Sequence, residues 1–178
     1  MKELFKGKKI ILTGRCEGDT ERAAEWYEDA EFARNVDTDV AYPRTPEEME
    51  GFAARTPNAF PFYIRLAKNQ ELIGFIALHS IEWNNQVGTV SIGIGSQAHR
   101  GKGYAAEALA LILQYAFCEL NLYRVKLNAI DYNERALHLY RSAGFTEEGR
   151  GRGEVYRDGR RFDLVLMGIL RPEWEALP

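Results

Sequence analysis

A glycine-rich, basic stretch between a predicted strand and a predicted helix places the strongest constraint on the fold of this chain. Residues 91–94 are predicted to be a strand, and apolar residues recur with helical spacing from Ala105 onward. Between them the chain reads Arg-Gly-Lys-Gly-Tyr over residues 100–104. The first N–H groups of a helix lack partners within the helix, and glycine lets an anion approach the backbone closely. The stretch therefore predicts a site for a phosphate or pyrophosphate group.

Two common phosphate-binding motifs do not fit this stretch. The nucleotide P-loop requires four residues between its first glycine and a Gly-Lys pair, followed by Ser or Thr. Counted from Gly95, the spacing is one residue too long, and Gly103 stands where the hydroxyl is needed. The dinucleotide fingerprint requires three glycines at fixed spacing in a βαβ unit, whereas the strands before Gly95 are expected to be antiparallel.

Residues 100–105, Arg-Gly-Lys-Gly-Tyr-Ala, resemble the acyl-CoA loop of the GNAT superfamily of N-acetyltransferases, Arg/Gln-x-x-Gly-x-Gly/Ala. Residues 133–145, Asn-Glu-Arg-Ala-Leu-His-Leu-Tyr-Arg-Ser-Ala-Gly-Phe, resemble the second acetyl-CoA motif of that superfamily, and the two motifs stand in the superfamily's order. Residues 122–127 and 157–160 are similar to its RimJ/RimL-type branch, which includes alanine N-terminal and polyamine acetyltransferases. The resemblance is specific from about Leu72 onward.

Length and composition agree with a globular enzyme of this size. We expect one domain over residues 1–178, because 46% hydrophobic and 28% charged residues are ordinary globular values. A net charge of −3 gives no overall attraction to nucleic acid. Without a signal peptide or an apolar run long enough to cross a membrane, a cytoplasmic location is expected. Cys16 and Cys118 fit no redox or metal spacing, and no metal site is expected.

The chain order predicts an α+β fold. We expect a first strand at 9–13, a helix from about 19 to 31 and a short helix at 45–52. Strands at 60–67, 72–81 and 87–94 follow, then a helix from about 103, a strand at 124–130, a helix at 133–144 and a closing hairpin at 145–156 and 162–170. This order, β-α-α-β-β-β-α-β-α-β-β, resembles that of the GNAT superfamily, which implies a mostly antiparallel mixed sheet of about seven strands with helices on both faces.

The resemblance also implies roles for individual residues. The loop would hold the pyrophosphate, exposed backbone at Ile92–Ile94 would pair with the pantetheine arm, Asn133 would contact the pantetheine, and Tyr140 would donate a proton to the leaving thiolate. Asn133 is also a good helix N-cap, and Tyr140 could be a core aromatic residue. The expected cofactor-binding residues are Ile92, Gly93, Ile94, Arg100, Gly101, Lys102, Gly103, Tyr104, Ala105, Asn133 and Tyr140.

The sequence does not offer the usual general base. Many relatives in this branch carry Glu or Asp at the position of Ser91, and serine is not a base at neutral pH. His79 and Glu82, near the end of the preceding strand, are the candidate substitutes, with a water chain as another route. The ordinary pKa of histidine suits the task, although a histidine at such a position is more often a surface or core-edge residue.

Together these features predict an acetyl-CoA-dependent N-acetyltransferase acting by direct attack in a ternary complex. Its acceptor would be a protein N-terminus, such as that of a ribosomal protein, or a small amine, such as a polyamine or an aminoglycoside. The alternative is a non-catalytic acyl-CoA-binding sensor, because Ser91 lacks the carboxylate. A homodimer is expected from the habit of the family and from the closing hairpin, whose outer strand would otherwise be an exposed edge.

Overall fold

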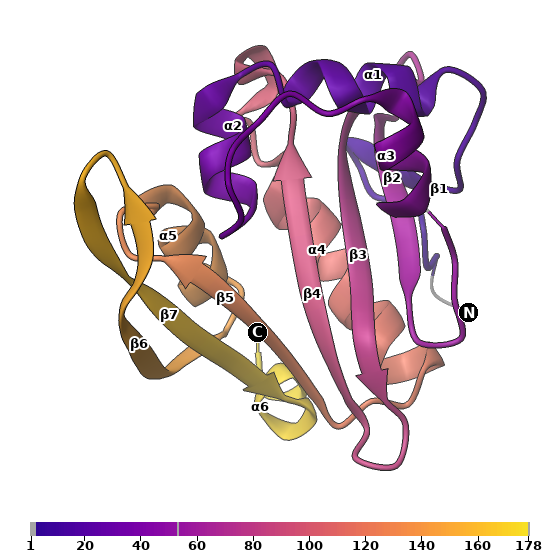
Figure 1. Cartoon of the computed structure of the whole chain (residues 1–178). Helices are drawn as coiled ribbons and strands as arrows, with labels where there is room; N and C mark the ends of the chain where they lie inside the picture. The colour runs from indigo at the N-terminus through magenta and orange to yellow at the C-terminus, as the bar shows by residue number, and fades with distance from the viewer. Residues whose placement is uncertain (1–2, 53, 178) are drawn as a thin grey trace.

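The structure is a computed structural model that describes residues 3–52 and 54–177. The order of its elements agrees with the predicted order, with one helix more than expected near each end of the chain (Figure 1). The elements are β1 (Ile10–Thr13), α1 (Asp19–Trp26), α2 (Ala30–Val36), α3 (Pro46–Phe52), β2 (Phe60–Leu66), β3 (Leu72–Glu82), β4 (Val87–Ile94), α4 (Tyr104–Gln114), β5 (Arg124–Ile130), α5 (Glu134–Ser142), β6 (Thr146–Arg157), β7 (Arg160–Leu170) and α6 (Arg171–Glu175).

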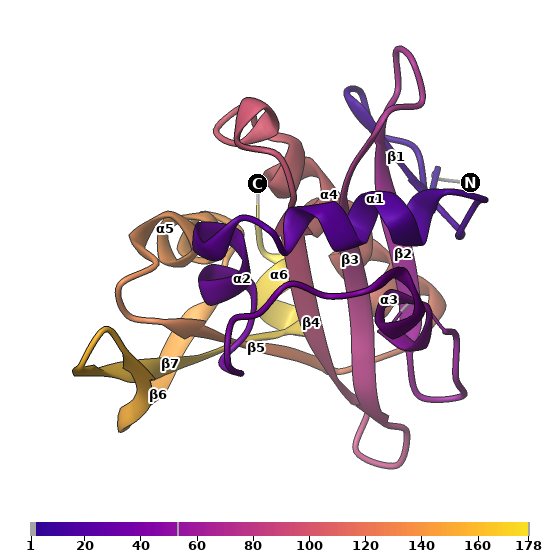
Figure 2. The ribbon, with the colours of Figure 1, turned by 45° about the horizontal axis from the view of Figure 1, so that its top comes forward.

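The predicted helix over residues 19–31 is two helices in the structure. Helix α1 ends at Trp26, and the backbone of Asp29 is extended. The Asp29 carboxylate accepts a hydrogen bond from the N–H of Glu31 at 2.9 Å, so Asp29 is the N-cap of a new helix. This break gives α2 a direction of its own, and it brings the end of α2 toward the point where β4 and β5 separate (Figure 2).

The strands form one seven-stranded sheet in the order β1-β2-β3-β4-β5-β7-β6. Every neighbouring pair is antiparallel except β4 and β5, which are joined by the crossover through α4. Strands β4 and β5 pair only between residues 87–89 and 124–126. Beyond Thr89 they diverge, and Figure 1 shows the sheet opening between them. Residues 90–94 of β4 therefore have no paired strand on this side in the described part of the chain.

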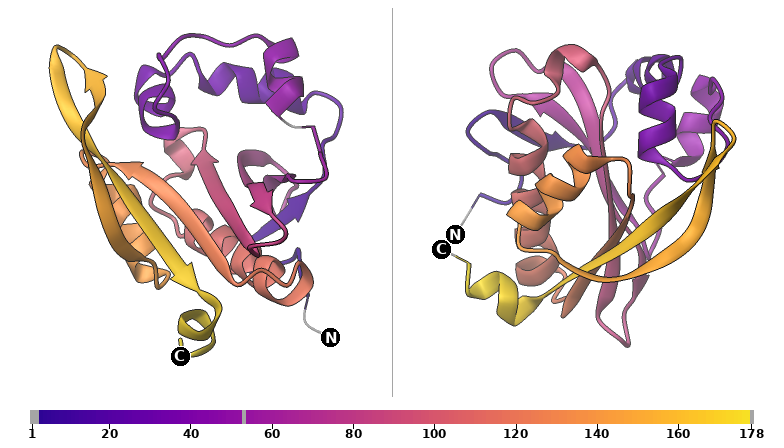
Figure 3. Two further views of the ribbon diagram at one scale, coloured as in Figure 1. Left: turned by 60° about the horizontal axis from the view of Figure 1, so that its bottom comes forward. Right: turned by 90° about the vertical axis from the view of Figure 1, so that its left-hand side faces the viewer.

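Helices cover both faces of the sheet, as predicted (Figure 3). Helices α4 and α5 lie on one face, where side chains of α4 such as Leu109 and Ile112 join Ile76 and Leu78 in the main hydrophobic core. Helices α1 to α3 lie on the other face, over a smaller cluster that includes Phe75. Burial of apolar side chains on both faces supplies the main driving force for this arrangement.

The closing hairpin places its apolar strand inside the sheet and its polar strand at the edge. Strand β7 lies between β5 and β6, so residues 164–169 are buried as predicted, except for Leu166, which is 39% exposed, and Leu170 is half-buried. Edge strand β6 is rich in Glu, Arg and Gly and has two shifts of register along its pairing with β7. Charges and bulges discourage pairing with another edge. The edge itself therefore gives no support to a homodimer, which stays a prediction.

Candidate active site

Two cavities meet where β4 and β5 separate. The first, here called the loop cavity, has a volume of about 500 Å³ and lies between the glycine-rich loop, α2 and α5. The second, here called the strand cavity, has a volume of about 170 Å³ and lies between the end of α2, β4 and β5. Five residues line both cavities: Asn35, Ile92, Asn133, Ala136 and Tyr140. The structure thus forms two adjoining compartments around Tyr140.

The glycine-rich loop is shaped as an anion site. Gly101 and Gly103 have φ values of 74° and 83°, which L side chains rarely adopt. Gly103 is the N-cap of α4, and no side chain caps its first N–H groups. A Cβ at Gly101 would have no atom within 4 Å. The loop therefore offers uncapped backbone donors at a positive helix end, beside the loop cavity, and fits a pyrophosphate group.

Arg100 contacts other parts of the protein rather than open solvent. Its guanidinium lies 3.1 Å from the Asp29 carboxylate and donates to the carbonyl oxygen of Gly95 at 2.8 Å. It also lies 3.5 Å from the Glu31 carboxylate, and its side chain is only 13% exposed. The contact predicted from the sequence was with pyrophosphate. In the structure Arg100 ties the loop to α2 and also lines the loop cavity, so its contact with pyrophosphate stays a prediction.

Tyr140 combines the two roles left open by the sequence. Its side chain belongs to the main core and packs near Phe145, yet it lines both cavities. Burial raises the pKa of Tyr140 to about 12. The phenol therefore keeps its proton at neutral pH and can serve as a donor where the two cavities meet.

Asn133 also combines two roles. Its side-chain oxygen accepts from the N–H of Ala136 at 3.2 Å and so caps α5. Its side-chain nitrogen donates to the carbonyl oxygen of Asn35 at 3.5 Å, and the residue lines both cavities. Helix capping and a place in the cavity wall coexist at this position.

His79 lines the strand cavity together with Ser91. The two residues lie on neighbouring strands, and His79 Nε2 is 2.8 Å from Ser91 Oγ. The other ring nitrogen, Nδ1, is 3.1 Å from Ser80 Oγ. Burial lowers the pKa of His79, so its imidazole is neutral at pH 7 and can accept a proton.

Glu82 does not reach the site, and this corrects one of the two candidate bases. Its carboxylate is exposed and accepts a hydrogen bond from Asn85 at 2.7 Å, in the turn between β3 and β4. Glu82 lines neither of the two cavities. The reason is a shift of register between His79 and Glu82, next to Ser80 with its positive φ of 50°, near the end of β3. His79 lies before this irregularity and faces the cavity.

Two of the predicted cofactor residues lie outside the cavity walls. A Cβ on Gly93 would come within 3.0 Å of Phe75 and 3.2 Å of Phe32, so this glycine permits close packing of α2 on the sheet. Lys102 is exposed, and its carbonyl oxygen accepts from Lys9 Nζ at 3.1 Å. The other predicted cofactor residues line the loop cavity: Ile92, Ile94, Arg100, Gly101, Gly103, Tyr104, Ala105, Asn133 and Tyr140.

The tip of the β6–β7 hairpin holds one wall of the strand cavity in place. Arg157 Nη2 donates to the carbonyl oxygens of residues 37, 38 and 39 at 3.2, 3.0 and 2.8 Å. Beside it, Asp158 forms a two-pronged ion pair with Arg34 of α2, each N–O distance being 3.0 Å. Asp37 and Thr38 line the strand cavity. Sequence patterns gave no signal for the contacts of Arg157 and Asp158, because these contacts join segments about 120 residues apart.

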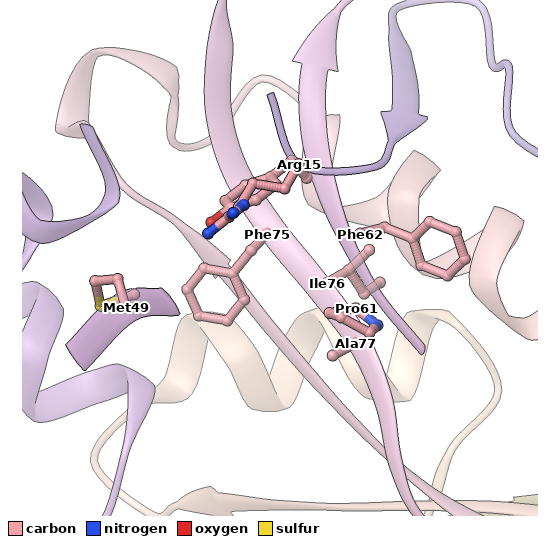
Figure 4. A pocket seen from close by; sticks show the side chains of 8 residues that line it. Arg15, Met49, Pro61, Phe62, Phe75, Ile76 and Ala77 are labelled. Atoms are coloured by element: carbon pink, nitrogen blue, oxygen red, sulfur yellow. The ribbon is translucent and has the colours of Figure 1, made fainter. Parts of the chain in front are cut away.

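The cavity beside Met49 and Phe75 is too small to be a second substrate site. Its volume is about 20 Å³, and it lies between α3 and strands β2 and β3 (Figure 4). It has room for about one water molecule. Among residues 3–52 and 54–177 there is no group of His, Cys, Asp and Glu that could hold a metal ion. No helix in this part of the chain is long and apolar enough to cross a bilayer.

The fold and the site define a class of protein. The sequence model of the Acetyltransferase (GNAT) domain family matches residues 9–146 of this chain. The chain therefore belongs to the GNAT acetyltransferase family, and the predicted family and fold class are confirmed.

Individual relatives are acetyltransferases with different acceptors. The chain is 36% identical over 105 residues to the putative ribosomal N-acetyltransferase YdaF of Bacillus subtilis, and 34% identical over 105 residues to the spermidine N(1)-acetyltransferase of Vibrio cholerae. These alignments cover 59% of this chain in each case, and 57% and 60% of the two relatives. The crystal structure of the Vibrio cholerae spermidine N-acetyltransferase in complex with CoA and spermine superposes with a TM-score of 0.85 at 26% identity, covering 95% of this chain and 99% of that one.

Proposed function

We propose that this protein transfers the acetyl group of acetyl-CoA to a primary amine by direct attack within a ternary complex. The observation that supports it most strongly is the meeting of the two cavities at Tyr140 and Ile92. Two substrates held in adjoining compartments can react without a diffusing intermediate, and holding them in place removes much of the entropic cost of the reaction.

The residues of the loop cavity fit acetyl-CoA. The uncapped N–H groups at the start of α4 would hold the pyrophosphate, and residues 92–94, free of a paired strand toward β5, would offer backbone groups to the pantetheine arm. Asn133 lies at the junction of the cavities, where it would contact the same arm. When bound, acetyl-CoA supplies an acetyl thioester, an activated acyl group with a thiol as its leaving group.

Two residues on the walls of the strand cavity are proposed to donate and accept the protons of the reaction. Tyr140, protonated up to about pH 12, is proposed as the acid that protonates the leaving sulfur. His79, neutral at pH 7, is proposed as the base that receives the proton lost by the amine. Glu82 has no part in this mechanism, because it lies at the end of β3, outside both cavities, and binds Asn85 of the β3–β4 turn.

The charge of the strand cavity favours an acceptor with a single ammonium group. Asp37 is the one carboxylate among the described residues that line it, and most of the other polar groups there are neutral: Asn35, Thr38, Thr89, Ser91, Asn128 and Asn133. A polyamine would bring further positive charges into this neutral wall, and an uncompensated buried charge is costly. Of the acceptors named above, a protein N-terminus or a small monoamine therefore suits the cavity better than a polyamine. We also propose that the protein is a RimJ/RimL-type enzyme of the cytoplasm and forms a homodimer.

A set of acceptors assayed by release of free thiol tests the transfer. A peptide with an N-terminal alanine, a simple monoamine, an aminoglycoside and spermidine would each be given with acetyl-CoA. We expect kcat/KM for the best single-ammonium acceptor to exceed that for spermidine by about tenfold or more, which corresponds to about 1.4 kcal/mol. Asp37→Asn should lower kcat/KM for every acceptor. If the parent protein instead has its highest kcat/KM with spermidine, the assignment of the acceptor class is wrong.

Binding of acetyl-CoA is measured separately by isothermal titration calorimetry. Failure of the folded protein to bind at millimolar acetyl-CoA would overturn the proposal as a whole. Binding with no thiol release above the blank for any amine would instead favour the acyl-CoA sensor, the alternative raised by the absence of a carboxylate at Ser91.

A further inference from the structure

We propose that Ser91 and His79 act as one proton-accepting pair, in which Ser91 Oγ takes the proton of the attacking amine while its own proton passes to His79 Nε2. This inference rests on the proposed acetyl transfer. It assigns to Ser91 the position of contact with the amine, where many relatives of the RimJ/RimL-type branch carry a carboxylate.

The placement of the two side chains supports direct transfer. His79 Nε2 and Ser91 Oγ are 2.8 Å apart, a normal distance for a hydrogen bond between a hydroxyl group and a ring nitrogen. Both residues line the strand cavity, whose wall also includes Tyr140. Ser91 precedes Ile92, one of the residues shared by the two cavities. The Ser91 hydroxyl therefore lies in the wall of the strand cavity.

The second nitrogen of the ring has a neighbour that can accept its proton, as the pair requires. Nδ1 lies 3.1 Å from Ser80 Oγ, and a proton on Nδ1 would be donated to that oxygen. Nε2 then carries the free lone pair and accepts from the Ser91 hydroxyl. Ser80 has a φ of 50° at the register shift of β3, and this irregularity places its hydroxyl beside the imidazole. The ring is thus oriented from both sides.

The surroundings favour a neutral imidazole. His79 pairs across the sheet with Thr89, which in turn pairs with Lys126 of β5. From the segment after α2, Asp37 is the carboxylate that lines the same cavity, and Glu82 farther along β3 is engaged by Asn85. Burial alone accounts for the lowered pKa of His79, and no charged neighbour contributes to it. Histidine is therefore ready to accept a proton over the range in which most enzymes work.

The transfer balances in protons and electrons. As the amine nitrogen forms its bond to the acetyl carbon, its N–H becomes strongly acidic and the proton passes to Ser91 Oγ. The proton of Ser91 moves to His79 Nε2, which leaves an imidazolium and a neutral serine. The C–S bond breaks with its electron pair on sulfur, which takes the proton of Tyr140. Transfer of one proton from His79 to the phenolate of Tyr140 through water restores both groups.

Two single variants, their double variant and one control test the pair. His79→Gln and Ser91→Ala should each lower kcat by about 10²-fold, with the affinity for acetyl-CoA unchanged in calorimetry. The double variant should be no slower than the slower single variant, because the two groups act as one unit. Glu82→Gln, which removes the rejected carboxylate on the same strand, should stay within about twofold of the parent.

A carboxylate placed at residue 91 tests most directly whether this position takes the proton of the amine. Ser91→Glu in the His79→Gln background should recover at least tenfold of the lost kcat, and the acidic limb of its pH–rate profile should move to lower pH, toward the pKa of a carboxyl group. A Ser91→Ala variant within about threefold of the parent would show that serine takes no part. Losses that multiply in the double variant would show that the two residues act independently and not as a pair.

Nitrogen NMR of His79 tests the same pair without any acetyl acceptor. The relay requires Nδ1 to carry the proton in the neutral ring, and Ser91→Ala should change the signal of Nε2. A neutral ring protonated on Nε2 in the parent protein would refute the relay, even if the protein proved to be an active acetyltransferase. Conversely, thiol release that fails for every amine, in a protein with the expected tautomer, would count against the proposed function and not against the pairing of Ser91 with His79.

Discussion

The guanidinium of Arg100 lies 3.1 Å from the carboxylate of Asp29, so the glycine-rich loop is ion-paired to the N-cap of α2. The loop faces the cavity proposed for acetyl-CoA, and α2 carries Asn35, which lines both cavities. One partly buried contact thereby links the loop beside the loop cavity to the helix that borders both cavities.

Arg100→Gln and Asp29→Asn distinguish a bracing role for Arg100 from a direct contact with phosphate. If Arg100 braces the loop, both variants should raise KM for acetyl-CoA by about threefold to tenfold with a smaller change in kcat, because a partly buried charged hydrogen bond contributes about 1 kcal/mol. If Arg100 instead binds phosphate, Asp29→Asn should free the guanidinium and lower KM. Steady-state kinetics with acetyl-CoA varied would decide between these outcomes.

Tyr140→Phe should separate catalysis from binding. The substitution keeps the buried ring and deletes the proton proposed for the leaving sulfur. We expect kcat to fall by about 10²-fold, with acetyl-CoA affinity and unfolding free energy nearly unchanged. Phe145→Leu, which alters the neighbouring core ring but no proton, is the matched control and should lower stability more than kcat. A Tyr140→Phe enzyme within about threefold of the parent, with thiol release limiting the rate, would return Tyr140 to a core role.

Tyr140 should also make the unfolding free energy of the protein depend on pH under alkaline conditions. In the unfolded chain its phenol ionises near pKa 10.0, whereas burial holds the folded pKa at about 12. The folded state keeps its proton while the unfolded state loses it, so the unfolding free energy should fall as pH rises from about 10 to about 12, by roughly 1 kcal/mol per pH unit, and should be unaffected below pH 10. Urea unfolding of the parent and of Tyr140→Phe should show a shallower fall in the variant. Equal slopes would contradict the raised pKa, because Tyr27, Tyr63 and Tyr115 are common to both proteins.

Gly103→Ala should weaken acetyl-CoA binding more than it weakens the fold. At φ 83° an alanine costs about 1 kcal/mol, and the easiest relief is a change in the loop that presents the N–H groups of α4. We expect the dissociation constant of acetyl-CoA to rise by about tenfold. Gly51→Ala in α3, where a Cβ meets no atom within 4 Å, is the control and should leave binding unchanged. Equal affinities in Gly103→Ala and the parent would remove the loop from the binding site.

Arg157→Ala should weaken binding of the amine acceptor and leave binding of acetyl-CoA unchanged. Loss of the three hydrogen bonds to carbonyls of residues 37–39 releases the wall of the strand cavity that carries Asp37. We expect KM for the amine to rise by about fivefold or more, with acetyl-CoA binding unchanged in calorimetry. Arg160→Ala removes an exposed arginine from the same hairpin and should behave like the parent. A loss of acetyl-CoA affinity in Arg157→Ala would show that the hairpin supports both cavities.

Local patterns in the sequence determined the family, the order of the elements and the position of the glycine-rich loop. Positive φ values at Gly101 and Gly103 and the N-cap at Asn133 follow from the conformational preferences of single residues, which act over a few positions of the chain. The apolar run of residues 164–170 likewise indicated a strand inside the sheet, because apolar side chains on both faces need cover on both faces.

The tertiary structure decided what these residues touch. The regular pairing of β3 with β4 up to His79 sets its imidazole beside Ser91, and the irregularity that follows leaves Glu82 at the end of β3 with Asn85 as its partner. The ion pair of Arg100 with Asp29 and the hydrogen bonds of Arg157 join segments at least 70 residues apart, and neither has a local signature. The physical reason is that a backbone preference is decided within a few residues. A side-chain partner is decided by strand register and helix packing, which depend on the whole folded chain.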